Sequence, residues 1–418
     1  MALKATLIAL LAITVGIYKI YLHDLVVLVS GIGRVIQPLS DFPQYQCHRL
    51  THPLLESCED LWLDHTSRKL YAACSNPAVR AAWSPGGNTY DLAGRAAGGG
   101  ATDHITVLDI DHPGADGLHG VRALPFRDQH GSAGQEVDLH GFDARVIDHG
   151  RRLRFWLINH RPPMDGLTGE LLEDATGVGA NSTVEIYDLD VRGGADHLVH
   201  VKTILADAIV SPNNLVVVDD EGDFLVTNDH TTRASTSMAL GLFLGLGSVS
   251  YCSSESGECH FASTGKVYLP NGITRNPASG LVYLAESGTG SVTVHQLTED
   301  RRLVKIDQVP LGMSLDNVSI DPEGNVFAAA FPDIRQFMKA FHDPYGTVAP
   351  STVMMIRKRK DMDGTSGGKD RYEVVKVVED RDAEVLPTTT TAVQDPVSGR
   401  LFLGGVSSTF LGVCERQT

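Results

Sequence analysis

One pattern recurs six times along this chain: a polar opening, an apolar run, a turn and a second apolar run. The copies open near residues 59, 140, 213, 271, 316 and 388, at intervals of 45 to 81 residues. Each interval can hold a four-stranded sheet with loops of variable length, and such sheets repeat around a central channel in β-propellers. The repeat therefore predicts an all-β fold, a six-bladed β-propeller, over residues 40–418.

The connections within the copies have the composition of hairpin turns. Residues 321–324 read Asp-Pro-Glu-Gly and residues 276–280 read Asn-Pro-Ala-Ser-Gly, and Pro and Gly supply the backbone angles that tight turns need. Three further stretches, at 86–101, 165–179 and 361–370, are rich in Gly or charge. We expect them to be exposed insertions, and the second, which follows His160, is a candidate cover for a site.

The balance of charge is acidic. The chain has 35 Lys and Arg against 51 Asp and Glu, a net charge of −16. Binding to nucleic acid depends on basic patches that displace counterions, so we expect no nucleic-acid partner. An acidic chain favours cations instead.

The N-terminus, residues 1–35, reads as a signal or anchor segment. An apolar run over 5–22, broken by Lys19, precedes a second run over 25–32, and together they predict an N-terminal apolar helix. The first run is longer than a typical signal-peptide core and shorter than a typical spanning helix, and an ordinary buried helix is the alternative. Export would place the protein in the secretory pathway, either extracellular or anchored to a membrane or lipid surface through this helix.

The cysteines favour disulfides over a metal site. Six are present, an even number, without a C-x-x-C pair. Cys252 and Cys259 flank a hairpin tip, Cys58 and Cys74 bracket one repeat unit, and a bond between Cys47 and Cys414 would tie the two ends of a ring together; some free thiols remain an alternative. Asn181-Ser-Thr is a glycosylation sequon, whereas Asn317-Val-Ser is expected to be buried.

Carboxylates and amides open most of the copies. The innermost strands of a propeller begin at the same end of its channel, so these side chains are expected to converge there. Oxygen atoms gathered in this way form the hard ligand set that Ca²⁺ selects. We expect a calcium site built from Glu59, Asp60, Asn213, Asn214, Asn271, Asp316 and Asn317, with only threonines in the sixth copy.

Two histidines point to hydrolysis at this site. His140 opens the second copy and His160 closes the same hairpin, so both are expected near the channel mouth. A histidine pair can accept a proton from water near neutral pH, and Ca²⁺ can polarise a carbonyl or phosphoryl oxygen.

Seven short motifs together resemble the paraoxonases, a family of calcium-dependent arylesterases and lactonases with a six-bladed propeller. The likeness extends from Cys47 to Cys414. The motifs are Glu59-Asp60-Leu, His140-Gly141, Asn159-His160, Thr227-Asn228-Asp229-His230, Asn271-Gly272-Ile273, Asp316-Asn317-Val-Ser-Ile-Asp-Pro and Cys414-Glu415.

The resemblance implies roles position by position. It implies His140 and His160 as the dyad that activates water, and a ring-closing disulfide between Cys47 and Cys414. It implies a catalytic calcium bound by Glu59, Asn213, Asn271, Asp316 and Asn317. It also implies a second, structural calcium held by Asp60, the main chain of Phe142 and residue 214.

The chain departs from the family at two places. Asn214 stands where the family has an aspartate, which removes a charged ligand from the structural calcium site. Phe331 or Pro332 stands where a histidine is common in the wall of the active site, and this affects organophosphate activity more than lactonase activity.

The function that these features favour is hydrolysis of small-molecule lactones or aryl esters with Ca²⁺ as cofactor. Two alternatives stay open: a propeller binding module that uses calcium only as a structural pin, and a hydrolase similar to gluconolactonases. Activity that is lost on chelation would separate the first alternative from the enzyme, and the range of substrates would separate the second.

Overall fold

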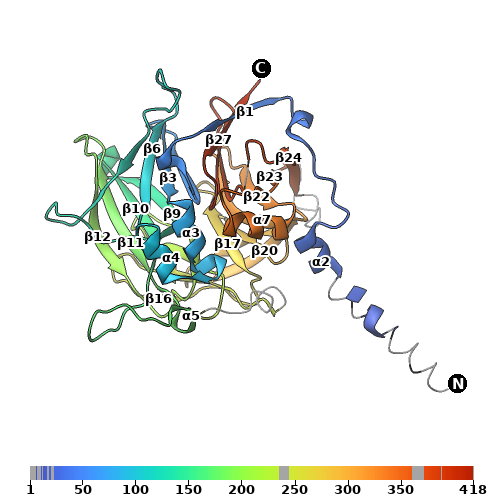
Figure 1. Ribbon diagram of the computed structural model, residues 1–418, viewed down its shortest axis with the longest axis horizontal. Helices are drawn as coiled ribbons and strands as arrows, with labels where there is room; N and C mark the ends of the chain where they lie inside the picture. Colours follow the sequence, from blue (N-terminus) through green and yellow to red (C-terminus); the bar gives the residue numbers. More distant parts are fainter. Residues whose placement is uncertain are drawn as a thin grey trace.

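Six sheets surround a central axis in the computed structural model (Figure 1). The structure describes residues 23–234, 244–359, 371–386 and 388–417, together with a few isolated positions before residue 23. Each innermost strand contacts the next around the ring, in the order β2, β9, β13, β17, β21, β25 and back to β2. The fold is therefore a six-bladed β-propeller, and the prediction of six blades is confirmed.

The blades follow one another along the chain, each written here from its innermost strand outward. Blade 1 consists of β2 (Asp60–Asp64), β3 (Lys69–Cys74), β6 (His104–Asp109) and β7 (Arg122–Leu124). Blade 2 consists of β9 (Leu139–Ile147), β10 (Arg152–Arg161), β11 (Asn181–Asp190), β12 (Leu198–Ile204) and the short β8 (Phe126–Arg127). Blade 3 consists of β13 (Pro212–Val217), β14 (Phe224–Asn228), β15 (Ser248–Cys252) and β16 (Cys259–Phe261).

The other three blades repeat the arrangement. Blade 4 consists of β17 (Pro270–Arg275), β18 (Val282–Glu286), β19 (Ser291–Leu297) and β20 (Leu303–Pro310). Blade 5 consists of β21 (Ser314–Ile320), β22 (Val326–Phe331), β23 (Ser351–Lys358) and β24 (Tyr372–Asp380). Blade 6 consists of β25 (Thr391–Asp395), β26 (Arg400–Gly404), β27 (Leu411–Arg416) and β1 (Tyr45–Leu50).

The sixth blade closes the ring because its outer strand comes from the other end of the chain. Strand β1 pairs with β27 in an antiparallel register that places Cys47 opposite Cys414, and Figure 1 shows the blue and red strands side by side. The two cysteines form a disulfide across this register. Cys58 pairs with Cys74, and Cys252 with Cys259 across the β15–β16 hairpin, so the described cysteines are all bonded.

The apolar core lies between the blades. Buried side chains cluster between each pair of neighbouring sheets; Tyr71 and Ile105 of blade 1, for instance, pack against Phe142 and Phe155 of blade 2. Burying such side chains stabilises the fold by about 1.5–3 kcal/mol each. At the predicted turn in blade 5, Gly324 has φ +86° and its N–H donates to the carbonyl of Asp321.

The α-helices at the ends and edges of the blades include α2 (His23–Ser30), α3 (Pro77–Ala82), α4 (Leu92–Ala97), α5 (Ala175–Val178) and α7 (Ile334–His342). None of the helices in the described part of the chain is both long and apolar enough to span a membrane. Most of the predicted apolar run 5–22 and the whole of the predicted insertion 361–370 lie outside the described residues.

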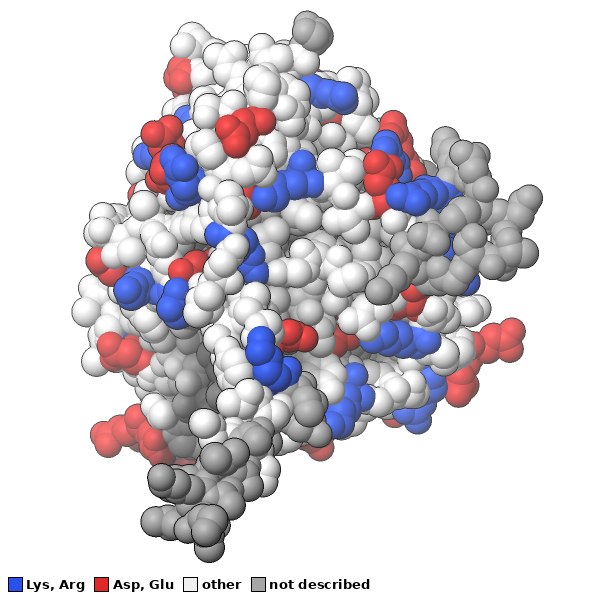
Figure 2. Space-filling model, turned by 90° about the vertical axis from the view of Figure 1, so that its right-hand side faces the viewer, with Lys and Arg blue, Asp and Glu red and all other residues white. Residues whose placement is uncertain are grey.

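The surface mixes charges of both signs. On the face shown in Figure 2, which is the right-hand side of Figure 1, Lys and Arg are interspersed with Asp and Glu.

Candidate active site

Glycine follows two of the residues that open the inner strands, and it allows those strands to approach their neighbours closely. A Cβ on Gly141 would lie 2.6 Å from the carbonyl oxygen of Asn213, and one on Gly272 would lie 2.5 Å from the Cα of Asn317. Any side chain at these two positions would force neighbouring inner strands apart. The His140-Gly141 and Asn271-Gly272 pairs therefore set how closely the channel oxygens approach one another.

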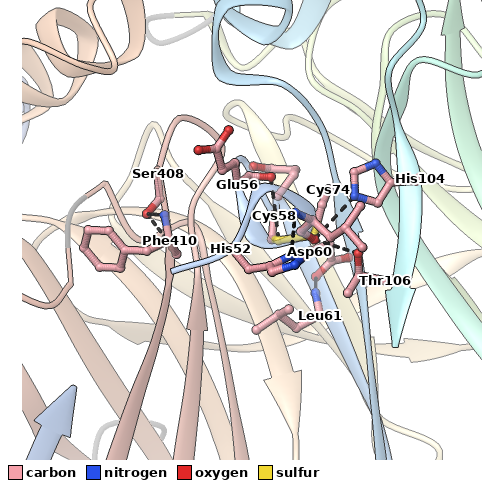
Figure 3. The surroundings of a disulfide bond; sticks show 12 residues. His52, Glu56, Cys58, Asp60, Leu61, Cys74, His104, Thr106, Ser408 and Phe410 are labelled. Atoms are coloured by element: carbon pink, nitrogen blue, oxygen red, sulfur yellow. Dashed lines mark hydrogen bonds between the residues drawn. A yellow bond between two sulfur atoms is a disulfide. The ribbon is translucent and has the colours of Figure 1, made fainter. Parts of the chain in front are cut away.

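A disulfide holds the segment that carries Glu59 and Asp60. Figure 3 shows the Cys58–Cys74 bond beside Asp60, where the chain starts β2. The N–H of Glu59 donates to the carbonyl of Ala73 at 2.9 Å, which continues the pairing of β2 with β3. Both carboxylates are consequently fixed in the channel, where 2% of Glu59 and 6% of Asp60 is exposed.

A cavity of about 180 Å³ opens at the end of the channel where the inner strands begin. Its floor is polar and its wall is largely apolar. The floor includes Glu59, His140, Asn213, Asn271 and Asp316. The wall includes Val29, Leu269, Phe331, Ile334, Phe337, Met338, Phe341 and Val406.

The floor presents oxygen atoms that have no partner. Glu59 Oε2, Asn213 Oδ1 and Asn271 Oδ1 are buried and accept no hydrogen bond. Leaving a buried acceptor unpaired costs about 1–3 kcal/mol, so several in one place indicate that a ligand satisfies them. This donor set, two amide oxygens and carboxylates, fits a hard cation such as Ca²⁺.

The electrostatics of the floor also fit a cation. Burial, together with the nearby Asp60 charge, raises the pKa of Glu59 to about 8 in spite of the opposing effect of Arg80. Burial and the charge of Glu59 raise the pKa of Asp316 well above its ordinary value. A bound divalent cation would neutralise this repulsion and keep both carboxylates ionised.

Asn317, which the resemblance implies as a calcium ligand, forms three hydrogen bonds in the channel. Its Nδ2 donates to the carbonyl oxygen of Glu59 at 3.1 Å and to Glu59 Oε1 at 3.2 Å, and its Oδ1 accepts from Asn214 Nδ2 at 2.6 Å. It is 2% exposed, as expected for the sequon that was predicted to be buried. Asn317 therefore links Glu59 to Asn214, and one donor already engages its Oδ1.

The residues implied for a structural calcium form a hydrogen-bonded cluster. This lower cluster, Asp60, Phe142 and Asn214, borders a second cavity of about 460 Å³ at the opposite end of the channel. The main chain of Phe142 offers its N–H to Asp60 Oδ2 at 3.2 Å, and Asn214 offers its Nδ2 at 3.1 Å. Donors that face the carboxylate do not fit a cation at this position.

His140, on the floor, lies next to His160, which is outside the cavity lining. Their ring centres are 5.1 Å apart with a 61° angle between the planes, and His140 Nε2 lies 3.8 Å from Glu59 Oε1. His160 does not line the cavity; its Nδ1 is hydrogen-bonded to Ser182 Oγ at 2.8 Å. Each ring keeps one buried nitrogen without a partner, Nδ1 of His140 and Nε2 of His160.

Burial makes both imidazoles neutral. It lowers the pKa of His160 to about 4, and with the charges of His160 and Arg80 it lowers the pKa of His140 well below its ordinary value. A neutral imidazole has a lone pair available to accept a proton.

Buried supports for this pair were not recognised in the sequence. Arg80 forms an ion pair with Asp103 at 3.0 Å and donates to the carbonyl of Leu139, while Asp103 accepts from the N–H of Leu139 at 2.6 Å. This clamp fixes the residue before His140. Trp83 Nε1 donates to the carbonyl of His160 at 2.7 Å. The signal in the sequence for α3, the helix that carries Arg80, is the N-cap Asn76 followed by Pro77.

Residues 86–101 form an insertion between β3 and β6, as predicted, but the insertion is only partly exposed. Gly86 and Gly87 line the cavity, and Arg95 in α4 is buried against Asp138 at 2.8 Å. The Gly content reflects close packing, since a Cβ on Gly86 would lie 3.3 Å from His140 Nε2. Helix α5, within residues 165–179, packs beside Trp83 through Ala175, and the cavity lining contains no residue from that segment.

Asp229 and His230 also line the cavity, with His230 Nδ1 2.8 Å from Asp229 Oδ1. The charge of Asp229 raises the pKa of His230. Phe331 lies in the wall against Phe337 with ring centres 3.9 Å apart. Asn181 begins β11 and is partly buried.

The fold is thus a closed six-bladed propeller, and at one end of its channel unpartnered oxygens and two neighbouring imidazoles lie beside a cavity with a largely apolar wall. The family model for arylesterases matches residues 177–407, more than half of the chain, and the chain belongs to this family.

Individual relatives share part of the sequence. Serum paraoxonase/arylesterase 2 of Gallus gallus is 31% identical over 179 residues, which cover 42% of this chain and 48% of the relative. Serum paraoxonase/lactonase 3 of Oryctolagus cuniculus is 27% identical over 213 residues, which cover 51% of this chain and 54% of the relative. The matched part of the chain thus spans about half the length of these relatives.

Solved structures with a similar outline include a luciferin-regenerating enzyme, with a TM-score of 0.47 and 12% identity over 89% of this chain and 95% of that one. A gluconolactonase from Xanthomonas campestris has a TM-score of 0.45 and 14% identity over 91% of this chain and 94% of that one.

Proposed function

We propose that the protein is a calcium-dependent hydrolase of small lactones or aryl esters. The observation that carries the proposal is the set of unpartnered buried oxygens on Glu59, Asn213 and Asn271, which lies beside two neutral imidazoles. Membership of the arylesterase family, and relatives named as arylesterase and lactonase, support this reaction class.

Glu59, Asn213, Asn271 and Asp316 would hold the cation, and we call these four residues the upper site. When bound, Ca²⁺ supplies a Lewis acid that polarises the ester carbonyl and stabilises the negative charge that develops on its oxygen. Arg80 is kept away from the substrate by its ion pair with Asp103, so it contributes positive charge to the surroundings without lining the cavity.

His140 acts as the general base. Its Nε2, on the side of Glu59, accepts a proton from the attacking water as the oxygen of that water bonds to the ester carbonyl carbon. His160 lies next to it, with ring centres 5.1 Å apart, and Ser182 orients the second ring through its contact with Nδ1. Collapse of the tetrahedral intermediate breaks the bond to the leaving alcohol oxygen, which takes a proton back from the pair.

The wall favours substrates with an apolar acyl or aryl part. Phe331, Phe337 and Phe341 face a cavity of about 180 Å³, enough for a small lactone ring or a phenyl ester. Phe331 or Pro332 stands where a histidine of the family would have added a polar group to this wall, so we expect poor hydrolysis of organophosphates.

We also propose that residues 1–35 direct or anchor the propeller of residues 40–418 in the secretory pathway, and that Asn181 is glycosylated there. The three disulfides agree with an oxidising compartment. Helix α2 rests on the cavity wall, because Val29 lines the cavity and the Ser30 carbonyl accepts from Arg335 Nη2 at 3.0 Å. A membrane or lipid surface that binds this N-terminal helix would thus be close to the active site.

The test is hydrolysis of a δ-lactone and of phenyl acetate by the purified full-length protein, with Ca²⁺, after chelation, and after Ca²⁺ is restored. We expect activity that disappears on chelation and returns with the ion. Activity that survives chelation contradicts the calcium dependence. Absence of activity on both substrates, combined with a lower melting temperature after chelation, favours the calcium-pinned binding module instead.

A further inference from the structure

The carboxylate of Asp60, on the channel axis, has four hydrogen-bond donors. Oδ1 accepts from the N–H of Leu61 at 2.9 Å and from Thr391 Oγ1 at 3.2 Å. Oδ2 accepts from the N–H of Phe142 at 3.2 Å and from Asn214 Nδ2 at 3.1 Å. A carboxylate offers about four acceptor positions, so both oxygens of Asp60 are saturated without a metal ion.

The orientation of the Asn214 amide follows from its neighbours. Asn214 Oδ1 accepts from the N–H of Leu215 at 2.6 Å, so Nδ2 faces the two acceptors Asp60 Oδ2 and Asn317 Oδ1. The reverse orientation would place an oxygen against two oxygens and an NH₂ group against an N–H. The amide is 3% exposed, so water does not compete for these contacts.

These contacts join alternate blades. Asp60 belongs to β2 of blade 1, Asn214 to β13 of blade 3 and Asn317 to β21 of blade 5. A cation bound by oxygens from three blades would make the same connection. We propose that the Asn214 amide takes the place of a second cation at this level of the channel, so that the folded chain holds at most one metal ion on its axis.

The substitution Asn214→Asp reverses this arrangement. The variant lacks the Nδ2 donor. The carboxylates of Asp60 and of residue 214, together with Oδ1 of Asn317, then face one point from three blades. Such an oxygen set repels itself when empty and suits Ca²⁺ when filled.

The experiment measures calcium stoichiometry by equilibrium dialysis and melting temperature with and without Ca²⁺, on the full-length protein. We expect the wild type to bind one ion, Asn214→Asp to bind one more, and Asn213→Asp to bind no more than the wild type. Asn213→Asp is the matched control, because it makes the same change in the adjacent residue, which belongs to the upper site. Without Ca²⁺, Asn214→Asp should melt several degrees below the wild type, and it should gain more from added Ca²⁺.

Two ions bound by the wild type, or equal stoichiometry in Asn214→Asp and the wild type, would overturn the inference. The inference concerns different oxygens from the proposed catalytic ion, and the two fail separately. A wild type that binds no ion and an Asn214→Asp variant that binds one would refute the upper site and support the inference. Where Asn214→Asp does not fold, the wild-type stoichiometry decides alone.

Discussion

Removal of the metal ion should make stability depend on pH in a way that identifies the channel carboxylates. Burial raises the pKa of Glu59 to about 8 and that of Asp60 to about 7, from ordinary values of 4.5 and 3.8. At pH 6.5 the unfolded chain has already released these protons, whereas the metal-free folded chain still holds most of them and releases them as the pH rises to 8. Stability of the metal-free protein therefore falls as the pH rises from 6.5 to 8.

The magnitude follows from the two values. Each group contributes at most about 1.4 kcal/mol per pH unit, and over this window Glu59 and Asp60 together remove about 2 kcal/mol of unfolding free energy. Asp316 and His230, whose pKa values are also raised, act in the same direction. His140 and His160 act in the opposite direction but below pH 6.5, because their folded pKa values are lowered and the unfolded imidazole takes up protons only there.

The assay is urea unfolding followed by tryptophan fluorescence, at pH 6.5, 7.25 and 8, with chelator and with saturating Ca²⁺. We expect the decline with chelator and a much smaller one with Ca²⁺, which keeps Glu59 and Asp316 ionised. Glu59→Gln should remove more than half of the decline that the two carboxylates produce. A metal-free stability that is constant or rises between pH 6.5 and 8 would refute the reasoning, because the carboxylates would then be balanced by charges within the chain.

Four variants test the other parts of the site. Asp316→Ala should abolish hydrolysis and lower the melting temperature measured in Ca²⁺, whereas Asp300→Ala, on an exposed turn, should do neither. Normal activity in Asp316→Ala would show that this residue does not belong to the site. His140→Gln should lower kcat by about 10²–10⁴-fold with calcium still bound, and the exposed His130→Gln should not; loss of calcium from His140→Gln would mean that the residue is a ligand or a packing group. Replacing Cys58 and Cys74 together by Ala should lower the unfolding free energy by about 3 kcal/mol, because the disulfide closes a loop with a separation of 16 residues. It should also weaken calcium binding, because Glu59 is then held less firmly; an unchanged calcium affinity would show that the disulfide does not position this carboxylate. Gly272→Ala should lower the unfolding free energy by about 1–3 kcal/mol and reduce calcium affinity, because its Cβ would lie 2.4 Å from the N of Val318. Gly166→Ala, with open space around it, is the control, and wild-type stability in Gly272→Ala would contradict the close approach.

Much of this architecture could be predicted from the sequence, because the signals involved are local. Alternating apolar runs bounded by Gly- and Pro-containing turns specify paired strands, and six such units predict six blades. The polar openings of these units mark the channel mouth, since every inner strand starts at the same end. Glu59, Asn213, Asn271, Asp316 and His140 are accordingly found on one cavity floor.

Only the tertiary structure decided how the remaining groups are used. The Gly-rich stretch at 86–101 carries no local sign that it packs against His140, and α7 contributes to the wall although its sequence is that of an ordinary amphipathic helix. The role of Asn214 depends on which way its amide faces, and that is set by Asp60 and Asn317, which are 154 and 103 residues away along the chain. Strand pairing follows from periodicity in neighbouring residues, whereas the orientation of a buried amide depends on partners from other blades that no local pattern specifies.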